Sequence, residues 1–479
     1  MRMAISILPL AGLLAAIATV AADESLKNAG TDTTEPVSLR RDEYAQPIAL
    51  DRSRNVYIPP RDQLVKTLRV SAAHNETHIQ IRYQFDTDEP SWYHDYLVYE
   101  DGRWMRYGSS PVGPQEDGLY EDRISMAIDV GHIEDYEIYG GFLVSHPGVR
   151  SRTDEIKPDE VADHPYFDQV LEVSDVRKFI ADSRTAAPET TLWRNVRSKD
   201  ELAELRRQGR FIDTWQWRAH RSNPLGYADN GYVLDYRHSA DGRGMYSTNW
   251  DPENEKPQWM FDHRKVGFHA LRKDRLLARK YDQNDFYYLA DRFAVPFDTD
   301  HEWQEGDTIP RRLLHEPQGS RGSLRATGQW KDGAWHVSVT RTLDTPNPLD
   351  SHALEPGKTY NVQFAVHTRA MGARWHYVSM PLKLGLSNET TAPLKATFSH
   401  QEELPQVEAS WIEVPIFYAG QITAREIRDA PSPLSSAVRA AAEDPLSRSR
   451  IETLARKLVE HEQAMLQKIS PIDDPSEKR

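Results

Sequence analysis

Alternating apolar and polar positions run through the middle of the chain and predict half-buried β-strands. The pattern begins at Leu64. An apolar residue at every second position places one face of a strand on a core. The clearest segment is 79–85, where the apolar positions are Ile79, Ile81, Tyr83 and Phe85. Further strands are expected over residues 123–130, 335–343 and 360–367.

Two Asp-Gly pairs predict tight hairpins between such strands. Asp101-Gly102 and Asp332-Gly333 are flanked by strand-like residues, with a tryptophan just beyond each. A type I′ turn needs positive φ at both central positions, which Asp and Gly tolerate. The spacing of strands and turns predicts a mainly β fold, an antiparallel immunoglobulin-like β-sandwich rather than a parallel α/β fold.

Two polar stretches, about residues 150–212 and 235–300, interrupt the strand pattern and are expected as insertions. Helix-like pieces lie at 174–183, where Ser174 is a candidate N-cap, and at 199–208. The C-terminal part, 426–479, contains a candidate capping box, Ser449 with Glu452, before apolar residues that fall on one helical face. We expect a helix over 448–469, packed on the domain or on a partner.

The first 22 residues resemble a secretory leader. Arg2 precedes an apolar run from Ala4 to Val20, and small residues precede Asp23. This layout predicts cleavage and export to the periplasm, with a retained N-terminal anchor as the alternative. Residues 23–46 are expected as a linker and 47–425 as the sandwich domain.

Composition narrows the chemistry. The chain has no cysteine, so it cannot form a disulfide, a thiolate metal site or a covalent c-type haem. The net charge of −14 argues against nucleic acid as the main partner. Its 12 Trp, 21 Tyr and 13 Phe suit a β core or a pocket for a flat ligand.

The usual catalytic signatures are missing from the sequence. There is no G-x-S-x-G, Walker A or G-x-G-x-x-G motif, and His301-Glu302 lacks the second histidine of a zincin because Glu305 occupies that position. A non-catalytic role is therefore favoured. Histidine offers a further candidate chemistry. His367 and His376 are predicted on adjacent antiparallel strands joined by a turn at 370–374, and His146 ends an apolar run.

Several motifs in order resemble the haem-binding domain of the ethylbenzene dehydrogenase-like family. They span about residues 64–386: KTLRV at 66–70, HIQIR at 78–82, YEDRI at 120–124, DTWQWRA at 213–219, GYAD at 226–229, TIPRR at 308–312, GSRG at 319–322, GQWKDGAWHV at 328–337 and RTL at 341–343. The family includes the gamma subunits of periplasmic molybdenum dehydrogenases and related cytochromes.

The resemblance implies a haem site. His376, followed by Tyr-Val-Ser, stands where gamma subunits have an axial lysine. His146 corresponds to the histidine of the C-x-x-C-H segment in relatives with covalent haem. Here both cysteines are gone, which implies a non-covalent b-type haem or a lost site. His376 and His146 are the implied iron ligands, with His367 in reserve.

Other residues are assigned around this haem by the same resemblance. Trp215 and Trp217 are candidates for walls of the porphyrin pocket, and Arg374 or Arg218 for contacts with the propionates. Iron with two strong axial ligands transfers electrons rather than activating substrate. The implied partner is a redox protein or membrane cytochrome; the oligomeric state stays open. The alternative function is a haem-free β-sandwich module that binds a ligand or carbohydrate.

The leader can be tested directly. If the secretory interpretation is right, N-terminal sequencing of the exported protein should begin near Asp23, because signal peptidase cleaves after small residues. A cytosolic product that retains Met1 would contradict it.

Overall fold

The computed structural model describes only part of the chain. The described residues are 61–108, 119–134, 136–140, 163–164, 166–167, 178–185, 195–369, 376–401, 404 and 407–418. The predicted leader, the linker and the C-terminal helix lie outside them. Within these ranges, no helix is long and apolar enough to cross a membrane.

Thirteen strands form one hydrogen-bonded sheet. In sheet order these are β18 (Arg325–Lys331), β19 (Ala334–Thr342), β2 (His78–Asp86), β1 (Val65–His74), β23 (Leu394–Phe398), β22 (Leu382–Gly385), β20 (Thr359–His367), β5 (Arg123–Asp129), β6 (Ile212–Arg218), β7 (Asp229–Val233) and β8 (Arg237–Ser239). A second link joins β1 to β20 through β24 (Trp411–Tyr418) and β21 (Tyr377–Ser379). Most pairs are antiparallel, although β23 runs parallel to β1 and β22. The predicted mainly β class is confirmed.

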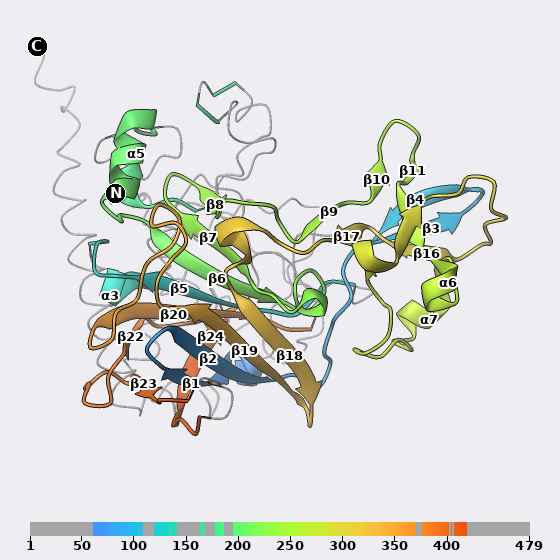
Figure 1. Cartoon of the computed structure of the whole chain (residues 1–479). Helices are drawn as coiled ribbons and strands as arrows, with labels where there is room; N and C mark the ends of the chain where they lie inside the picture. The colour runs from blue at the N-terminus through green and yellow to red at the C-terminus, as the bar shows by residue number, and fades with distance from the viewer. Residues whose placement is uncertain are drawn as a thin grey trace, which may run out of the picture.

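The sheet folds back so that two layers face each other across the core (Figure 1). Strands β18, β19, β2 and β1 form one layer, and β20, β5, β6 and β7 the other. The Trp217 and Trp335 rings meet edge to face at 5.0 Å between the layers, and the Tyr83 and Phe364 rings at 5.8 Å. The layers are therefore parts of one continuous sheet, whereas an immunoglobulin-like sandwich has two separate sheets.

Both predicted hairpins are confirmed. Asp101 and Gly102 have φ of 53° and 74° between β3 (Tyr96–Glu100) and β4 (Arg103–Tyr107). Asp332 and Gly333 have φ of 52° and 80° between β18 and β19. All four angles are positive, as the type I′ turn requires.

The two helices predicted between 174 and 208 have different outcomes. Helix α5 (Lys199–Arg207) begins with a capping box between Ser198 and Glu201. The helix predicted at 174–183 is wrong in its described part, where residues 178–180 are irregular and only η4 (Ala181–Ser183) is a 3-10 turn. The Ile180 amide donates to the Leu234 carbonyl at 2.8 Å instead, so a tertiary hydrogen bond replaces the helical one.

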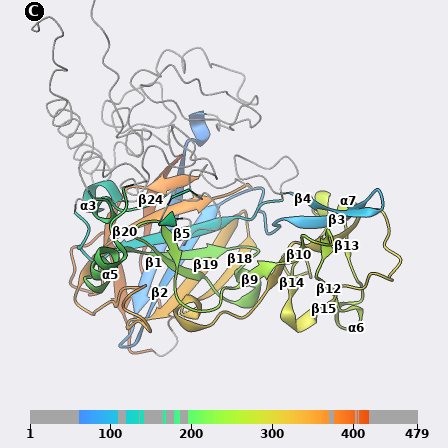
Figure 2. The same ribbon diagram turned by 90° about the horizontal axis from the view of Figure 1, so that it is seen from above.

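A second lobe lies beside the sandwich (Figures 1 and 2). Most of it comes from residues 246–314, which overlap the insertion predicted at 235–300, and it pairs with the β3–β4 hairpin. Its strands are β9 (Tyr246–Thr248), β10 (Trp250–Asp251), β11 (Lys256–Pro257), β12 (Trp259–Phe261), β13 (Leu271–Arg272), β14 (Leu289–Ala290), β15 (Ala294–Pro296), β16 (Asp307–Pro310) and β17 (Arg312–Leu314), with helices α6 (His263–Val266) and α7 (Lys273–Leu277).

The lobe and the sandwich share one hydrophobic core. The hydroxyl groups of Tyr93 and Tyr96 donate to the carbonyls of Tyr281 and Tyr287, at 2.7 and 3.0 Å. Short elements complete the described fold: α3 (Tyr136–Tyr139), η1 (Arg61–Gln63), η6 (Asn223–Leu225), η7 (Asp291–Phe293) and η8 (Gly319–Gly322). Because one core spans both parts, the junction between them is a fixed part of the structure.

A close contact between the layers predicts a strong effect of one glycine. A Cβ added at Gly328 would come within 2.2 Å of Cζ2 of the buried Trp217 ring. Gly328→Ala should lower the free energy of unfolding by about 1–3 kcal/mol, because the indole cannot move without repacking the core. Chemical denaturation measures this. Thr327→Ala, an exposed neighbour on the same strand, is the control; equal stabilities for the two variants would contradict the packing.

Candidate functional site

Four side chains form a row across one face of the second layer. His367 on β20 pairs with Arg123 on β5, which pairs with Arg218 on β6. Directly opposed residues in antiparallel strands share a face of the sheet. His376 immediately precedes β21, which pairs with β20, and its ring stacks on His367 at 4.5 Å with 12° between planes. The predicted proximity of the two histidines is confirmed, although His376 lies one residue before β21 and not on a strand.

The face that carries this row is polar and yet buried. Arg123, Arg218, Gln216, Gln363 and His367 are each at most 7 % exposed. The polar groups make specific hydrogen bonds: Gln363 Nε2 donates to the Ser379 carbonyl at 2.8 Å and Gln216 Nε2 to Ser125 Oγ at 3.0 Å. A buried polar face of this kind is unusual for a β-layer and marks it as a candidate binding surface.

The two predicted tryptophans lie on the opposite face. On β6, Trp215 and Trp217 alternate with Gln216 and Arg218 and pair with Met126 and Ile124 of the core. Trp217 packs on Trp335, and the Arg341 guanidinium lies 4.7 Å from the Trp215 ring centroid. The structure therefore brings His376 and His367 together but separates both tryptophans from them by the thickness of the sheet.

The remaining predicted site residues, His146 and Arg374, lie outside the described residues. Their proposed roles stay predictions. Lys383, which follows His376 closely in sequence, forms an ion pair with Glu137 at 2.8 Å on the surface. It is therefore engaged elsewhere in this structure.

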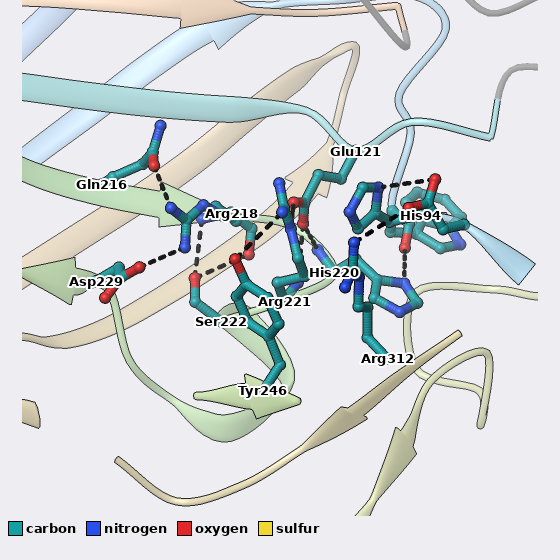
Figure 3. Close-up of polar contacts among 12 residues, drawn as sticks. His94, Glu121, Gln216, Arg218, His220, Arg221, Ser222, Asp229, Tyr246 and Arg312 are labelled. Atoms are coloured by element: carbon teal, nitrogen blue, oxygen red, sulfur yellow. Dashed lines mark hydrogen bonds and ion pairs between the residues drawn. The ribbon is translucent and has the colours of Figure 1, made fainter. Parts of the chain in front are cut away.

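Beyond the row, a buried charged cluster occupies the junction between sandwich and lobe (Figure 3). Glu121 is fully buried and accepts hydrogen bonds from the backbone amides of His220 and Arg221, at 2.7 and 2.8 Å, and from Arg221 Nε. Arg221 and its neighbouring cations outweigh burial and hold the pKa of Glu121 below its ordinary value. The carboxylate thus ties the segment just before β5 to the turn after β6.

Two histidines of this junction are neutral at physiological pH. Burial lowers the pKa of His220 to about 4, although Glu121 acts in the other direction. Burial also lowers the pKa of His94, and Arg221 and Arg312 lower it further. His220 Nδ1 lies 3.0 Å from the Trp92 carbonyl, whereas His220 Nε2 and both His94 nitrogens have no hydrogen-bond partner. Such buried orphan nitrogens are rare in folded proteins.

Arginines dominate the rest of the junction. Arg218 pairs with Asp229 at 2.6 Å, and Arg312 approaches Asp95 at 3.5 Å. Tyr246 lies among these cations: burial raises the pKa of its phenol, but Arg221 and Arg218 outweigh that effect and lower it to about 8. The potential at this junction is therefore positive. In the described part of the chain, no group of three or more His, Cys, Asp or Glu residues could hold a bare metal ion.

The sequence matches one known protein family over most of its length. The sequence profile of the family described as ethylbenzene dehydrogenase matches residues 28–379, most of the chain. The chain belongs to the ethylbenzene dehydrogenase family. No curated protein matches the chain in sequence. In this member of the ethylbenzene dehydrogenase family, the matched region includes the whole row from Arg123 to His376 and ends just after it.

The sequence identified the histidine pair of this family member but missed the junction. Glu121 and Arg218 stand within the quoted family motifs, whereas His94 lies outside them and His220 just beyond one. Strand alternation alone would have placed Trp215 and Trp217 together, away from Arg218. It does not say which of those faces meets His367, because that depends on the register of β5 against β6.

The lowered pKa of His220 predicts a pH effect on stability. The folded protein keeps His220 neutral between pH 6.5 and about 4, while the unfolded chain binds a proton below 6.5. Stability is therefore lost as the pH falls through this window. His220→Gln removes this titrating imidazole. The substitution should therefore reduce the loss of unfolding free energy between pH 7.5 and 5 by about 2 kcal/mol.

Denaturant unfolding at the two pH values measures this difference. His132→Gln, which removes an exposed imidazole, is the control and should keep the wild-type pH dependence. If His220→Gln also keeps it, the buried neutral state of His220 is contradicted.

Proposed function

We propose that this chain is a periplasmic electron-transfer protein that binds b-type haem non-covalently, as a gamma-type subunit or partner of a redox system. The observation that carries the proposal is the row His376, His367, Arg123 and Arg218 on one buried polar face. It places imidazole, which ligates haem iron, next to cations that suit carboxylates. Membership of the ethylbenzene dehydrogenase family supports the same assignment.

His376 is the proposed ligand of the pair because it is half-buried, whereas His367 is only 5 % exposed. The two rings stack nearly parallel and come from adjacent strands, so they cannot approach one iron from opposite sides. At most one of them is an axial ligand, and the other orients it. The opposite ligand must come from a different segment, and His146 remains our candidate.

A haem site also needs cations for the two propionates, and the arginines of the row would provide them. Haem propionates project from the rim of the macrocycle, so their cations are expected beside the iron ligand rather than at it. Arg123 is the cross-strand neighbour of His367 and Arg218 is the next one along the row. Both are buried, and guanidinium groups form strong charge-assisted hydrogen bonds with carboxylates.

The proposed residues would hold such a cofactor without a covalent bond. When bound, haem supplies a one-electron redox centre whose potential depends on its axial ligands and their surroundings. The residues of this chain would hold the imidazole in place and balance the charge of the propionates. Without cysteine, the cofactor would be held only by these contacts.

Location and partners follow from the same proposal. A cleaved leader would place the protein in the periplasm, where related gamma-type subunits work. Its partner would be a redox protein or a membrane cytochrome, and the net charge of −14 suits a basic docking surface. A haem-free module that binds a ligand through exposed aromatics is the alternative. Trp411, which is 39 % exposed beside the Arg69 guanidinium, is the observation in its favour.

An absorption spectrum tests the proposal. Full-length protein produced with haem should show a low-spin Soret band that shifts on reduction with dithionite. His376→Ala should lose haem or become high-spin, because removing one imidazole opens a coordination position. His336→Ala, a half-buried histidine of the other layer, is the control and should keep the wild-type spectrum. Circular dichroism verifies that both variants fold.

Two results would overturn the assignment. A wild-type low-spin spectrum in folded His376→Ala would exclude His376 as the ligand. Wild-type protein without any Soret band after incubation with haemin would exclude haem binding and favour the alternative module.

A further inference from the structure

Three guanidinium groups surround one tyrosine at the junction. The guanidinium carbons of Arg221, Arg312 and Arg218 lie 5.2, 5.6 and 6.0 Å from the centroid of the Tyr246 ring. Arg218 ends β6, Arg221 lies in the turn after β6, and Arg312 begins β17. Figure 3 shows them gathered around Tyr246 and Glu121. Like charges are not brought together inside a protein without a counter-charge.

The carboxylates at the junction are shared rather than matched one to one. Asp229 pairs with both Arg218 and Arg321, at 2.6 and 2.8 Å. Arg311 and Arg312 each lie 3.5 Å from Asp95, and Glu121 forms an ion pair with Arg221. Since His94 and His220 are neutral, they add no compensating charge. These ion pairs thus leave the cluster with more positive than negative charge.

The orphan imidazole of His94 is a second, independent observation. His94 is 1 % exposed, and neither of its ring nitrogens has a hydrogen-bond partner. Its ring lies 6.0 Å from that of His220, beside Arg312 (Figure 3). His94 Nδ1 lies 3.8 Å from Asp95 Oδ1, which is too far for a hydrogen bond. A neutral imidazole has one N–H to donate, and an anion held by the arginines would accept it.

We propose that Arg218, Arg221 and Arg312, with His94, bind a carboxylate group of a ligand at the junction. Guanidinium presents a planar fork of donors that matches the two oxygens of a carboxylate. The carboxylate has two possible sources. It belongs to a haem propionate, in which case this inference rests on the proposed function, or to a free small carboxylate, in which case it is independent. The continuity of the row from His367 through Arg123 to Arg218 connects the junction to the proposed haem site.

Arg312 is the residue to change. Its side chain is 21 % exposed, and its partner Asp95 also pairs with Arg311, so its loss leaves no buried carboxylate unpaired. Arg312→Gln removes the charge, and Arg312→Lys keeps the charge without the planar fork. The matched control is Arg292→Gln, because the Arg292 guanidinium lies 5.8 Å from the Tyr288 ring in the lobe, outside the cluster.

Two probes distinguish the sources. Haemin and haemin dimethyl ester are titrated into haem-free protein and followed by absorption, and succinate is titrated into the same protein by calorimetry. If propionates bind here, haemin should bind about tenfold or more tightly than its ester, and Arg312→Gln should abolish that ratio. If a free carboxylate binds here, succinate should bind the wild-type chain and the Arg292→Gln control but bind Arg312→Gln at least about tenfold more weakly. In either case the affinity of Arg312→Lys should lie between those of the wild type and Arg312→Gln.

The inference is overturned if haemin and its ester bind alike and succinate does not bind, or if Arg312→Gln behaves as wild type with both probes. Failure of the proposed function looks different. Neither haemin nor its ester would then give a Soret band in complex with the protein, while the succinate titration would still decide the carboxylate site.

Discussion

The architecture depends on the two faces of one β-layer. Strand alternation sends Trp215, Trp217 and Phe364 to the core between the layers and sends Arg123, Arg218 and His367 to the other face. The core face is satisfied by packing. The polar face is also buried, and burying guanidinium and imidazole groups costs several kcal/mol for each ion that is left without a partner. The function of the site therefore depends on which groups pair with the buried polar side chains of that face.

Hydrogen bonds and ion pairs within the chain satisfy part of it. Glu121 neutralises Arg221 and fixes the turn after β6, and Asp229 holds Arg218. The orphan nitrogens of His94 and the excess of guanidinium over carboxylate groups around Tyr246 are not explained in this way. The histidine pair at one end and the arginine cluster at the other have complementary chemistry, since one offers a metal ligand and the other an anion site. A ligand that combines a metal with carboxylates would use both.

The sequence predicted what depends on local pattern. The Asp-Gly hairpins and the strands at 79–85 and 360–367 are correct because turn chemistry and two-residue periodicity act within a few residues. The adjacency of His367 and His376 follows from the short connection between their strands. The helix proposed at 174–183 failed in its described part because the Ile180 amide binds the Leu234 carbonyl, a partner far away in sequence.

Features set by register and by distant contacts were not predictable. The tryptophans of β6 were assigned to the haem pocket because aromatic residues suit a flat ligand, but the pairing of β6 with β5 places them in the core. The junction brings His94, Glu121, His220 and Arg312 together from four separate segments (Figure 3). No spacing rule in one sequence connects those positions, and only the fold shows that their charges meet.

The central claim is that the buried polar face holds haem, with His376 at the iron. Anomalous diffraction at the iron absorption edge, from crystals of the protein grown with haemin, tests it most directly. The account predicts one iron peak beside the His376 imidazole, with density for propionates on the side of Arg123. A peak beside other residues, or no peak in crystals whose His376 is well ordered, would contradict it.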